Sequence, residues 1–332
     1  MMQDTAAPAE PPRQLQVDYH ADADAGLWLA REDVLAVFGF GATAGAHEDP
    51  RWLRVPLEPH GPPQIEVWRT RAPVRHGRDA GLQWAEGGGL LFGAIEITEG
   101  DAGILGAARE AYARMEAELA ARGHPHVLRI WNYFDDITLG EGDAERYRGF
   151  CVGRVQGMAP FEDQQLPAAT AIGRRDGRRV LQVYWLAARE PGRPVDNPRQ
   201  VSPYRYPRQY GPQSPSFARA MLPPPGFDAP LMLSGTAAIV GHASRHPGDP
   251  LRQLDETLRN LDALIATARE TRPALPARLD HEARLKVYVR DAGDLPRLAE
   301  ALRERLPDTP HLLLHAAVCR RELVVEIDGV HG

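Results

Sequence analysis

The chain has 332 residues, of which 43% are hydrophobic and 25% are charged. That length exceeds what one hydrophobic core normally organises, so two or three domains are expected. The formal net charge of -6 gives no basic field for a polyanion, and Lys and Arg are scattered along the whole chain. These features exclude nucleic acid as a partner.

Residues 1–14 are rich in Ala, Pro and Glu and are expected to be disordered, because they cannot bury enough apolar surface to offset the entropy of ordering. They lack the basic start and apolar run of an export signal, and no window of the chain approaches 18 uninterrupted apolar residues. The two cysteines, Cys151 and Cys319, are too few for a disulfide framework. We therefore expect a cytoplasmic protein without a membrane segment.

A small β-rich domain is predicted for residues 15–87. Short runs with strand character are separated there by Gly and Pro. These runs cover residues 15–19, 34–40, 52–57, 65–69 and 81–85.

A second domain is predicted for residues 88–196. A strand at 90–97 precedes a helix at 102–122, in which apolar residues from Ile104 to Leu119 recur at helical spacing and Gly123 marks the end. A strand at 127–132 and a helix at 145–155 follow. Strands at 169–173 and 179–187 are expected to form a hairpin, with Asp176-Gly177 as its turn.

Residues 220–332 repeat this order and form the third predicted domain. Strands are expected at 231–240, 284–289, 312–318 and 323–327, with helices at 250–268 and 295–305. Matching elements lie roughly 145–150 residues apart, which is far longer than a solenoid period and indicates a domain duplication. Two similar domains imply a cleft between them.

The connector between the two repeats, residues 197–219, contains the run Tyr204-Arg-Tyr-Pro-Arg-Gln-Tyr. Linkers seldom carry so many aromatic residues, and this density of Arg and Tyr is typical of a surface that holds an anion.

Several long strings give the chain a more specific character. The C-terminal strings Leu231-Met-Leu-Ser-Gly-Thr-Ala and Leu285-Lys-Val-Tyr-Val-Arg-Asp resemble the RidA/YjgF fold. The whole chain resembles the chorismatase family. The residues that carry this resemblance are Arg129-Ile-Trp-Asn-Tyr-Phe, Asn197-Pro-Arg-Gln-Val-Ser-Pro-Tyr-Arg-Tyr-Pro-Arg-Gln-Tyr-Gly-Pro, Ser214-Pro-Ser-Phe-Ala-Arg-Ala, Ser234-Gly-Thr-Ala and His246-Pro-Gly-Asp.

The resemblance implies an α/β (α+β) chain of tandem RidA/YjgF-like domains in pseudo-threefold arrangement, with the strand-rich start as a degenerate third unit. It implies an enzyme that removes pyruvate from chorismate to give 3-hydroxybenzoate, with 4-hydroxybenzoate as a possible second product. Members that use water instead give a dihydroxycyclohexadiene carboxylate. The active site is expected between the central and C-terminal domains.

By resemblance, Tyr147, Arg154, Tyr206 and Arg219 bind the substrate. Tyr147 and Arg154 are seven residues apart, which places them on one helical face; a solvated face is the alternative reading. An arginine fork suits a carboxylate, but spacing does not separate Arg219 from Arg205 and Arg208. The alternative for Arg219 is a surface ion pair.

By resemblance, Glu326 is the catalytic carboxyl, and Gln182 holds the equivalent place in the central repeat. Strand alternation puts Glu326 on one face with Val324 and Asp328, and such a face is often just half exposed. Burial against an apolar wall raises the pKa of a carboxyl and keeps it protonated, as a general acid requires.

Two further positions are implied to determine the product. Cys319 stands where the aromatising members carry Cys; a buried structural Cys is the alternative. Ala237 departs from the Gly of one aromatising subgroup and leaves the subtype open.

No cofactor and no metal are expected. His242, His246 and Asp249 lie on a loop before a helix, where Asp249 suits the N-cap position better than metal binding. A RidA-like imine or enamine hydrolase and a non-catalytic binder of aromatic metabolites remain the alternative functions. Because the three units are fused in one chain, a monomer is expected.

Overall fold

The computed structural model describes residues 13–21, 24–158 and 165–332. The expected disorder of residues 1–14 concerns mainly residues 1–12, which lie outside the described residues. Arg13 and Gln14 both have partners: the Arg13 guanidinium lies 2.9 Å from a carboxylate oxygen of Glu282, and the backbone N–H of Gln14 donates to the Asp228 carbonyl.

The central unit is a six-stranded sheet with strand order β10-β9-β11-β8-β7-β6. Its elements are β6 (Arg75–Asp79), β7 (Leu82–Gly87), β8 (Leu90–Thr98), α2 (Gly103–Arg122), β9 (His126–Asp135), η1 (Gly142–Ala144), α3 (Arg146–Gly157), β10 (Ala168–Arg174) and β11 (Val180–Ala188). As predicted, α2 ends at Gly123, which adopts a left-handed conformation with φ of 66°.

The C-terminal unit is a seven-stranded sheet with strand order β12-β13-β14-β19-β17-β18-β4. Its elements are β12 (Arg193–Val195), β13 (Ala220–Leu222), β14 (Leu231–Ala237), α4 (Pro250–Thr271), β17 (Arg284–Val289), η5 (Ala292–Asp294), α5 (Leu295–Arg305), β18 (His311–His315) and β19 (Val325–His331). The connector carries η3 (Pro203–Arg205) and η4 (Arg208–Tyr210), and a small hairpin joins β15 (Ile239–Val240) to β16 (Ala243–Ser244).

The N-terminal unit is a four-stranded sheet with strand order β1-β5-β2-β3. Its elements are β1 (Gln16–Ala21), α1 (Ala25–Leu29), β2 (Val34–Phe40), β3 (Trp52–Val55) and β5 (Gln64–Arg69), while β4 (Glu58–Pro59) pairs with β18 of the C-terminal sheet. Read from β3, this order equals β10-β9-β11-β8 and β18-β17-β19-β14, and the first pair is parallel in each unit. The α/β class and its internal repetition are therefore confirmed.

Two expectations about the strands were wrong. The β6–β7 hairpin belongs to the central sheet rather than to the N-terminal unit, because a tight turn at Gly88 and Gly89, both with positive φ, pairs β7 with β8. Strands β10 and β11 do not form a hairpin around Asp176-Gly177. Both of them pair with β9, which lies between them.

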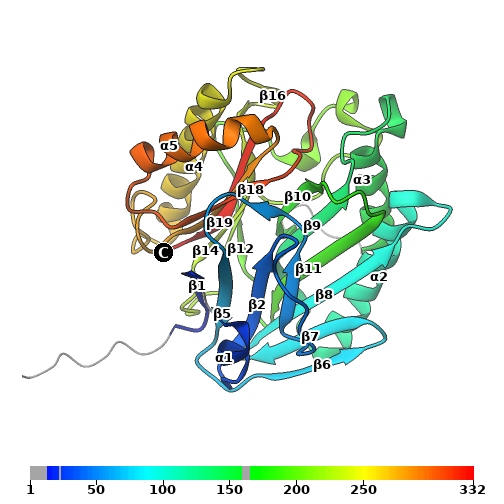
Figure 1. Cartoon of the computed structure of the whole chain (residues 1–332), viewed down its shortest axis with the longest axis vertical. Helices are drawn as coiled ribbons and strands as arrows, with labels where there is room; N and C mark the ends of the chain where they lie inside the picture. The colour runs from blue at the N-terminus through cyan, green and yellow to red at the C-terminus, as the bar shows by residue number, and fades with distance from the viewer. Residues whose placement is uncertain (1–12, 22–23, 159–164) are drawn as a thin grey trace, which may run out of the picture.

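Helices cover the outer faces of the two large sheets, and the inner faces meet in a shared core (Figure 1). Helices α2 and α3 pack on the central sheet, whereas α4 and α5 pack on the C-terminal sheet. A large hydrophobic cluster joins all three units; its members include Phe38, Trp131 and Tyr288. This junction fixes the units relative to one another.

Buried polar groups also cross the junction. The Arg129 guanidinium lies 3.0 Å from an Asp328 carboxylate oxygen, and the Lys286 amine lies 2.7 Å from Glu66. The Tyr288 hydroxyl donates to Asp328. Such buried pairs hold the units in one relative arrangement, because breaking a pair would leave a buried charge without its partner.

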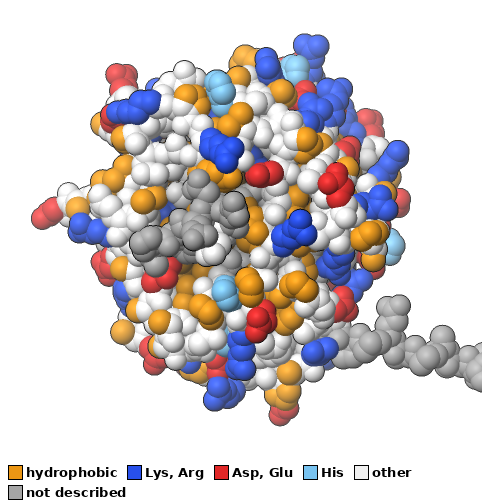
Figure 2. All heavy atoms as spheres, turned by 180° about the vertical axis from the view of Figure 1, so that it is seen from behind, with side chains coloured by type: hydrophobic (Ala, Val, Ile, Leu, Met, Phe, Trp, Pro, Cys, Tyr) orange, Lys and Arg blue, Asp and Glu red, His pale blue; other side chains and the backbone are white. Residues whose placement is uncertain are grey.

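Figure 2 shows one face of the molecule, on which basic and acidic side chains are interspersed. None of the helices in the described ranges is long and apolar enough to cross a membrane.

Candidate active site

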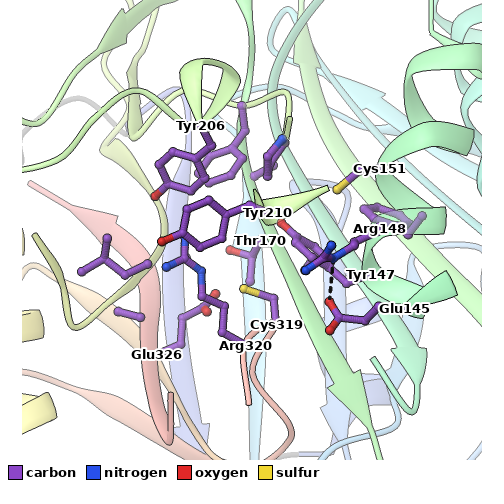
Figure 3. Close-up of a pocket in the computed structure, with 18 of the residues that line it drawn as sticks. Glu145, Tyr147, Arg148, Cys151, Thr170, Tyr206, Tyr210, Cys319, Arg320 and Glu326 are labelled. Atoms are coloured by element: carbon purple, nitrogen blue, oxygen red, sulfur yellow. Dashed lines mark ion pairs between the residues drawn. The ribbon is translucent and has the colours of Figure 1, made fainter. Parts of the chain in front are cut away.

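A cavity of about 440 Å³ lies between the central and C-terminal units. Its walls come from α3, β10, the connector, β14, β19 and the loop that precedes β19 (Figure 3). All seven site residues expected from the sequence line this one cavity: Tyr147, Arg154, Tyr206, Arg219, Ala237, Cys319 and Glu326.

Helix α3 forms the central-unit wall because glycines let its other face pack closely on α2. A Cβ built on Gly153 would overlap the Leu105 carbonyl oxygen, and one on Gly157 would overlap the Arg109 carbonyl oxygen. The adjacent stripe of α3, formed by Tyr147, Cys151 and Arg154, then lines the cavity.

Arg154 is buried, with 3% of its surface exposed. Its Nε lies 3.3 Å from the Met158 sulfur, and its guanidinium lies 5.1 Å from the centroid of the Tyr112 ring. Among the residues that the structure describes, Nη2 of Arg154 has no hydrogen-bond partner. A buried cationic donor left unpaired in a cavity wall suits an anionic ligand.

Burial raises the pKa of the Tyr147 hydroxyl well above its usual value, and neighbouring Cys151 and Cys319 raise this pKa further. The hydroxyl therefore stays protonated and can donate a hydrogen bond into the cavity.

On the connector, Nη2 of Arg219 donates to the Tyr206 hydroxyl (2.6 Å) and to the Val201 carbonyl (2.9 Å). Nε of Arg219 is buried and unpaired within the described chain. Arg205 and Arg208 are exposed and do not line the cavity. The structure thus separates three arginines that spacing could not separate.

Glu326 lies on β19, opposite Ala237 of β14 and Tyr288 of β17. Every residue of β19 is buried, so the half-exposed face considered from the sequence is wrong. Burial, together with the negative charge of Asp328, raises the pKa of Glu326 to about 8, although Arg129, Arg219 and Arg320 oppose this shift. The carboxyl is therefore mostly protonated at neutral pH.

Gln182 occupies the corresponding place on β11, opposite Glu96 of β8 and Tyr133 of β9. Its amide donates to the Glu96 carboxylate and to the Arg54 carbonyl. In the central unit the position therefore holds an amide, which is no proton donor for acid catalysis.

Cys151 and Cys319 both line the cavity, and both are free thiols. Burial raises the pKa of Cys151 to about 12 and raises that of Cys319 as well. Both groups remain neutral thiols, so neither serves as a nucleophile.

Several cavity residues were not among those expected from the sequence: Cys151, Thr170, Gly235 and Arg320. Cys151 could have been found, since it lies four residues after Tyr147 on the same helix. The others reach the cavity through contacts between segments far apart in the chain.

No group of three potential metal ligands occurs within residues 13–21, 24–158 and 165–332. Asp249 caps α4, and its carboxylate accepts a hydrogen bond from the Arg252 amide. His246 lies 3.4 Å from a carboxylate oxygen of Glu256.

Comparisons with known proteins agree on one family. The family model described as "Chorismatase FkbO/Hyg5-like, N-terminal" matches residues 66–187. A 3-hydroxybenzoate synthase from Streptomyces hygroscopicus is 37% identical over 285 residues, which cover 82% of this chain and 83% of that protein. A chorismatase from Streptomyces rapamycinicus is 36% identical over 277 residues, or 80% and 81% of the two chains.

A solved structure gives the same result. A crystal structure of a chorismatase superposes with a TM-score of 0.83 at 30% identity, and the match covers 97% of this chain and 99% of that chain. The repeated α/β units and the arginine-lined cavity agree with these relatives, which show that the protein is an enzyme. The chain belongs to the chorismatase family.

Proposed function

We propose that the protein removes pyruvate from chorismate and releases 3-hydroxybenzoate. The observation that carries this proposal is the buried Glu326, whose raised pKa of about 8 makes it a proton donor at neutral pH. It shares a cavity with Arg154 and Arg219, and chorismate carries two carboxylates. The relative named 3-hydroxybenzoate synthase supports the choice of product.

In the proposed reaction, Glu326 gives its proton to the methylene carbon of the enol ether. The resulting oxocarbenium ion is stabilised by the Glu326 carboxylate that remains. The ring hydroxyl of the substrate then attacks the ring carbon that held the ether oxygen. The bond between that carbon and the ether oxygen breaks, pyruvate departs, and an arene oxide forms, while the hydroxyl proton returns to the Glu326 carboxylate. The arene oxide aromatises to 3-hydroxybenzoate, so the two products together contain all the atoms of chorismate and no net water is taken up.

Arg154 and Arg219 are proposed to bind the two carboxylates, with Tyr147 and Tyr206 as hydroxyl donors that orient the substrate. A guanidinium can hold a carboxylate through two parallel hydrogen bonds. The unpaired donors of both arginines support this role.

Cys319 and Ala237 are proposed to determine the product. Both border the Glu326 side of the cavity, and small apolar or weakly polar groups there leave few partners for a nucleophilic water. A hydrolytic route to a dihydroxycyclohexadiene carboxylate and partial formation of 4-hydroxybenzoate are the alternatives within the family.

A non-catalytic binder would not need a protonated buried carboxyl. A plain RidA-like imine hydrolase lacks the connector that brings Tyr206 and Arg219 into this cavity, so the two features together favour the chorismatase reaction. We also propose a cytoplasmic monomer without a cofactor, since the cavity already lies between two units of one chain.

Incubation of the purified protein with chorismate tests this function. Pyruvate is measured with a coupled lactate dehydrogenase assay, and the ring product is identified by chromatography. Stoichiometric pyruvate and 3-hydroxybenzoate are expected. A diene acid would indicate the hydrolytic route, and the absence of pyruvate would refute the proposal.

A further inference from the structure

Arg320 is a third guanidinium in the cavity, and its orientation is fixed from several sides. It follows Cys319 in the loop before β19. Its Nη1 donates to the His242 carbonyl (2.9 Å) and to the Ser244 hydroxyl (3.1 Å). The guanidinium also lies 4.1 Å from the centroid of the Tyr210 ring. Contacts of this kind pre-organise an arginine for binding.

The remaining donors of Arg320 are available to a ligand. In the described part of the chain, Nη1 makes both hydrogen bonds of this guanidinium, and Nε and Nη2 make none. The side chain is half-buried and lines the cavity. The side chain that carries these two free donor groups therefore borders the cavity.

The arginines divide the cavity into two ends. Arg219 and Arg320 lie 5.7 and 5.2 Å from the centroid of the same Tyr206 ring. The Arg219 carbonyl accepts a hydrogen bond from the backbone N–H of Ser234, whose neighbour Gly235 lies against the Glu326 carboxyl. This contact places Arg219, and Arg320 beside the same ring, at the catalytic end, and the charges of both arginines lower the pKa of Glu326.

Arg154 marks the other end. It lies on α3, and its guanidinium lies 5.1 Å from the centroid of the Tyr112 ring on α2, so it belongs to the central-unit wall. Figure 3 shows the same division: Tyr147 and Cys151 come from one wall, and Arg320 and Glu326 come from the other.

The chemistry of the substrate determines which carboxylate belongs at which end. In an enol ether of pyruvate, the methylene carbon that accepts the proton is bonded to the carbon that bears the side-chain carboxylate. A proton donor can reach that methylene only at hydrogen-bond distance. The side-chain carboxylate must therefore lie at the Glu326 end, where Arg219 and Arg320 are.

We propose that Arg320 binds the side-chain carboxylate together with Arg219, whereas Arg154 binds the ring carboxylate. This assignment rests on the proposed function and adds a substrate-binding residue to it. It orients the substrate with its enol ether towards β19 and its ring carboxylate towards α3.

Three simple ligands test the two ends of the cavity individually. A compound with both carboxylates is 3-(carboxymethoxy)benzoate; 3-methoxybenzoate lacks the side-chain carboxylate, and phenoxyacetate lacks the ring carboxylate. Their affinities are measured by calorimetry and ligand-observed NMR for the wild type, Arg320→Ala and Arg154→Ala. Arg205→Ala is the matched control, because Arg205 is an exposed connector arginine outside the cavity.

In Arg320→Ala, the affinities for 3-(carboxymethoxy)benzoate and phenoxyacetate should fall about 10-fold or more, the scale of one charge-assisted hydrogen bond. The affinity for 3-methoxybenzoate should stay within about twofold. In Arg154→Ala, the affinity for 3-methoxybenzoate should instead be the monocarboxylate affinity that falls, because this ligand carries only the ring carboxylate. Arg205→Ala should match the wild type for all three ligands.

Arg320→Lys is a control for loss of folding, because it keeps the positive charge beside the tyrosine rings. It should weaken 3-(carboxymethoxy)benzoate less than Arg320→Ala does and leave 3-methoxybenzoate unchanged. Equal loss of all three ligands in both Arg320 variants, unchanged affinity in both, or a wild type that does not bind 3-(carboxymethoxy)benzoate would overturn the assignment. If the ligand pattern holds but chorismate yields no pyruvate, the proposed function fails and the assignment of the two ends stands.

Discussion

The carboxyl group of Glu326 lies against the Cα atom of Gly235, in space that a side chain at that position would occupy. A Cβ built on Gly235 would overlap Oε1 of Glu326 and would lie 3.3 Å from Cγ2 of Thr170. Gly235 is part of an irregularity in β14, where the register with β19 shifts between Leu233 and Thr236. The bulge lets the catalytic end of the cavity hold a carboxyl group.

Gly235→Ala should displace the Glu326 carboxyl. Because a shift of about 1 Å in a catalytic group can lower a rate about 10²-fold, chorismate turnover should fall by at least that factor. The chain should remain folded, since the overlapping atom is the end of a flexible side chain. Steady-state kinetics with circular dichroism measures both effects.

Gly293→Ala is the control, because a Cβ at Gly293 has no neighbour within 4 Å among the described residues. It should retain wild-type turnover. Equal turnover in the two variants would show that Gly235 does not position Glu326.

The rate should depend on the protonation of Glu326. Its pKa of about 8 means that the acid form predominates below that pH, so kcat/KM should be lost as the pH rises through about 8. The measurement is kcat/KM from about pH 6 to about pH 10, in buffers of constant ionic strength. A rate that increases over this range would contradict a general acid at this position.

The same buried carboxyl should make stability depend on pH. The pKa of Glu326 is about 8 in the folded chain against 4.5 for a free side chain, so the folded state binds more protons between these values. The free energy of unfolding should therefore fall as the pH rises from about 4.5 to about 8, by about 1.4 kcal/mol for each unit of pKa difference.

Glu326→Gln removes this proton binding. In urea unfolding, the stability of the variant relative to the wild type should increase with pH by a few kcal/mol, on the scale of about 1.4 kcal/mol per pKa unit. Parallel pH profiles for the two proteins would mean that the pKa of Glu326 is not raised.

Local patterns in the sequence predicted much of the fold. The spacing of apolar residues indicated α2, and Gly123 marked its end. Asp249 was correctly expected to cap the N-terminus of α4. Strand pairing was harder to predict from the sequence. The signal at Asp176-Gly177 is local, whereas both β10 and β11 pair with β9, which precedes them by a helix or more.

The candidate site shows the same contrast between local patterns, which the sequence reveals, and long-range contacts, which it does not. Spacing placed Tyr147 and Arg154 on one face of a helix, but it could not separate Arg219 from Arg205 and Arg208. Burial separates them in the structure. Arg320 was missed because its position depends on contacts with distant rings and with the β16 segment.

Cys319→Ala should change the product. Removing the thiol opens space, and one water needs about 30 Å³ and polar partners, which Glu326 can supply. Part of the product should then shift from 3-hydroxybenzoate to the dihydroxycyclohexadiene acid, which chromatography separates. In ¹⁸O-labelled water the wild-type ring product should contain no label; a labelled hydroxybenzoate would refute the internal route.

The central claim is that Glu326 protonates the methylene carbon of chorismate. Wild type and Glu326→Gln are incubated with chorismate in deuterated water, and pyruvate is trapped at once as lactate for mass spectrometry. The wild type should release pyruvate with one deuterium in its methyl group, and the variant should be slower by about 10²- to 10⁴-fold. Pyruvate release by Glu326→Gln at more than half the wild-type rate would contradict the claim.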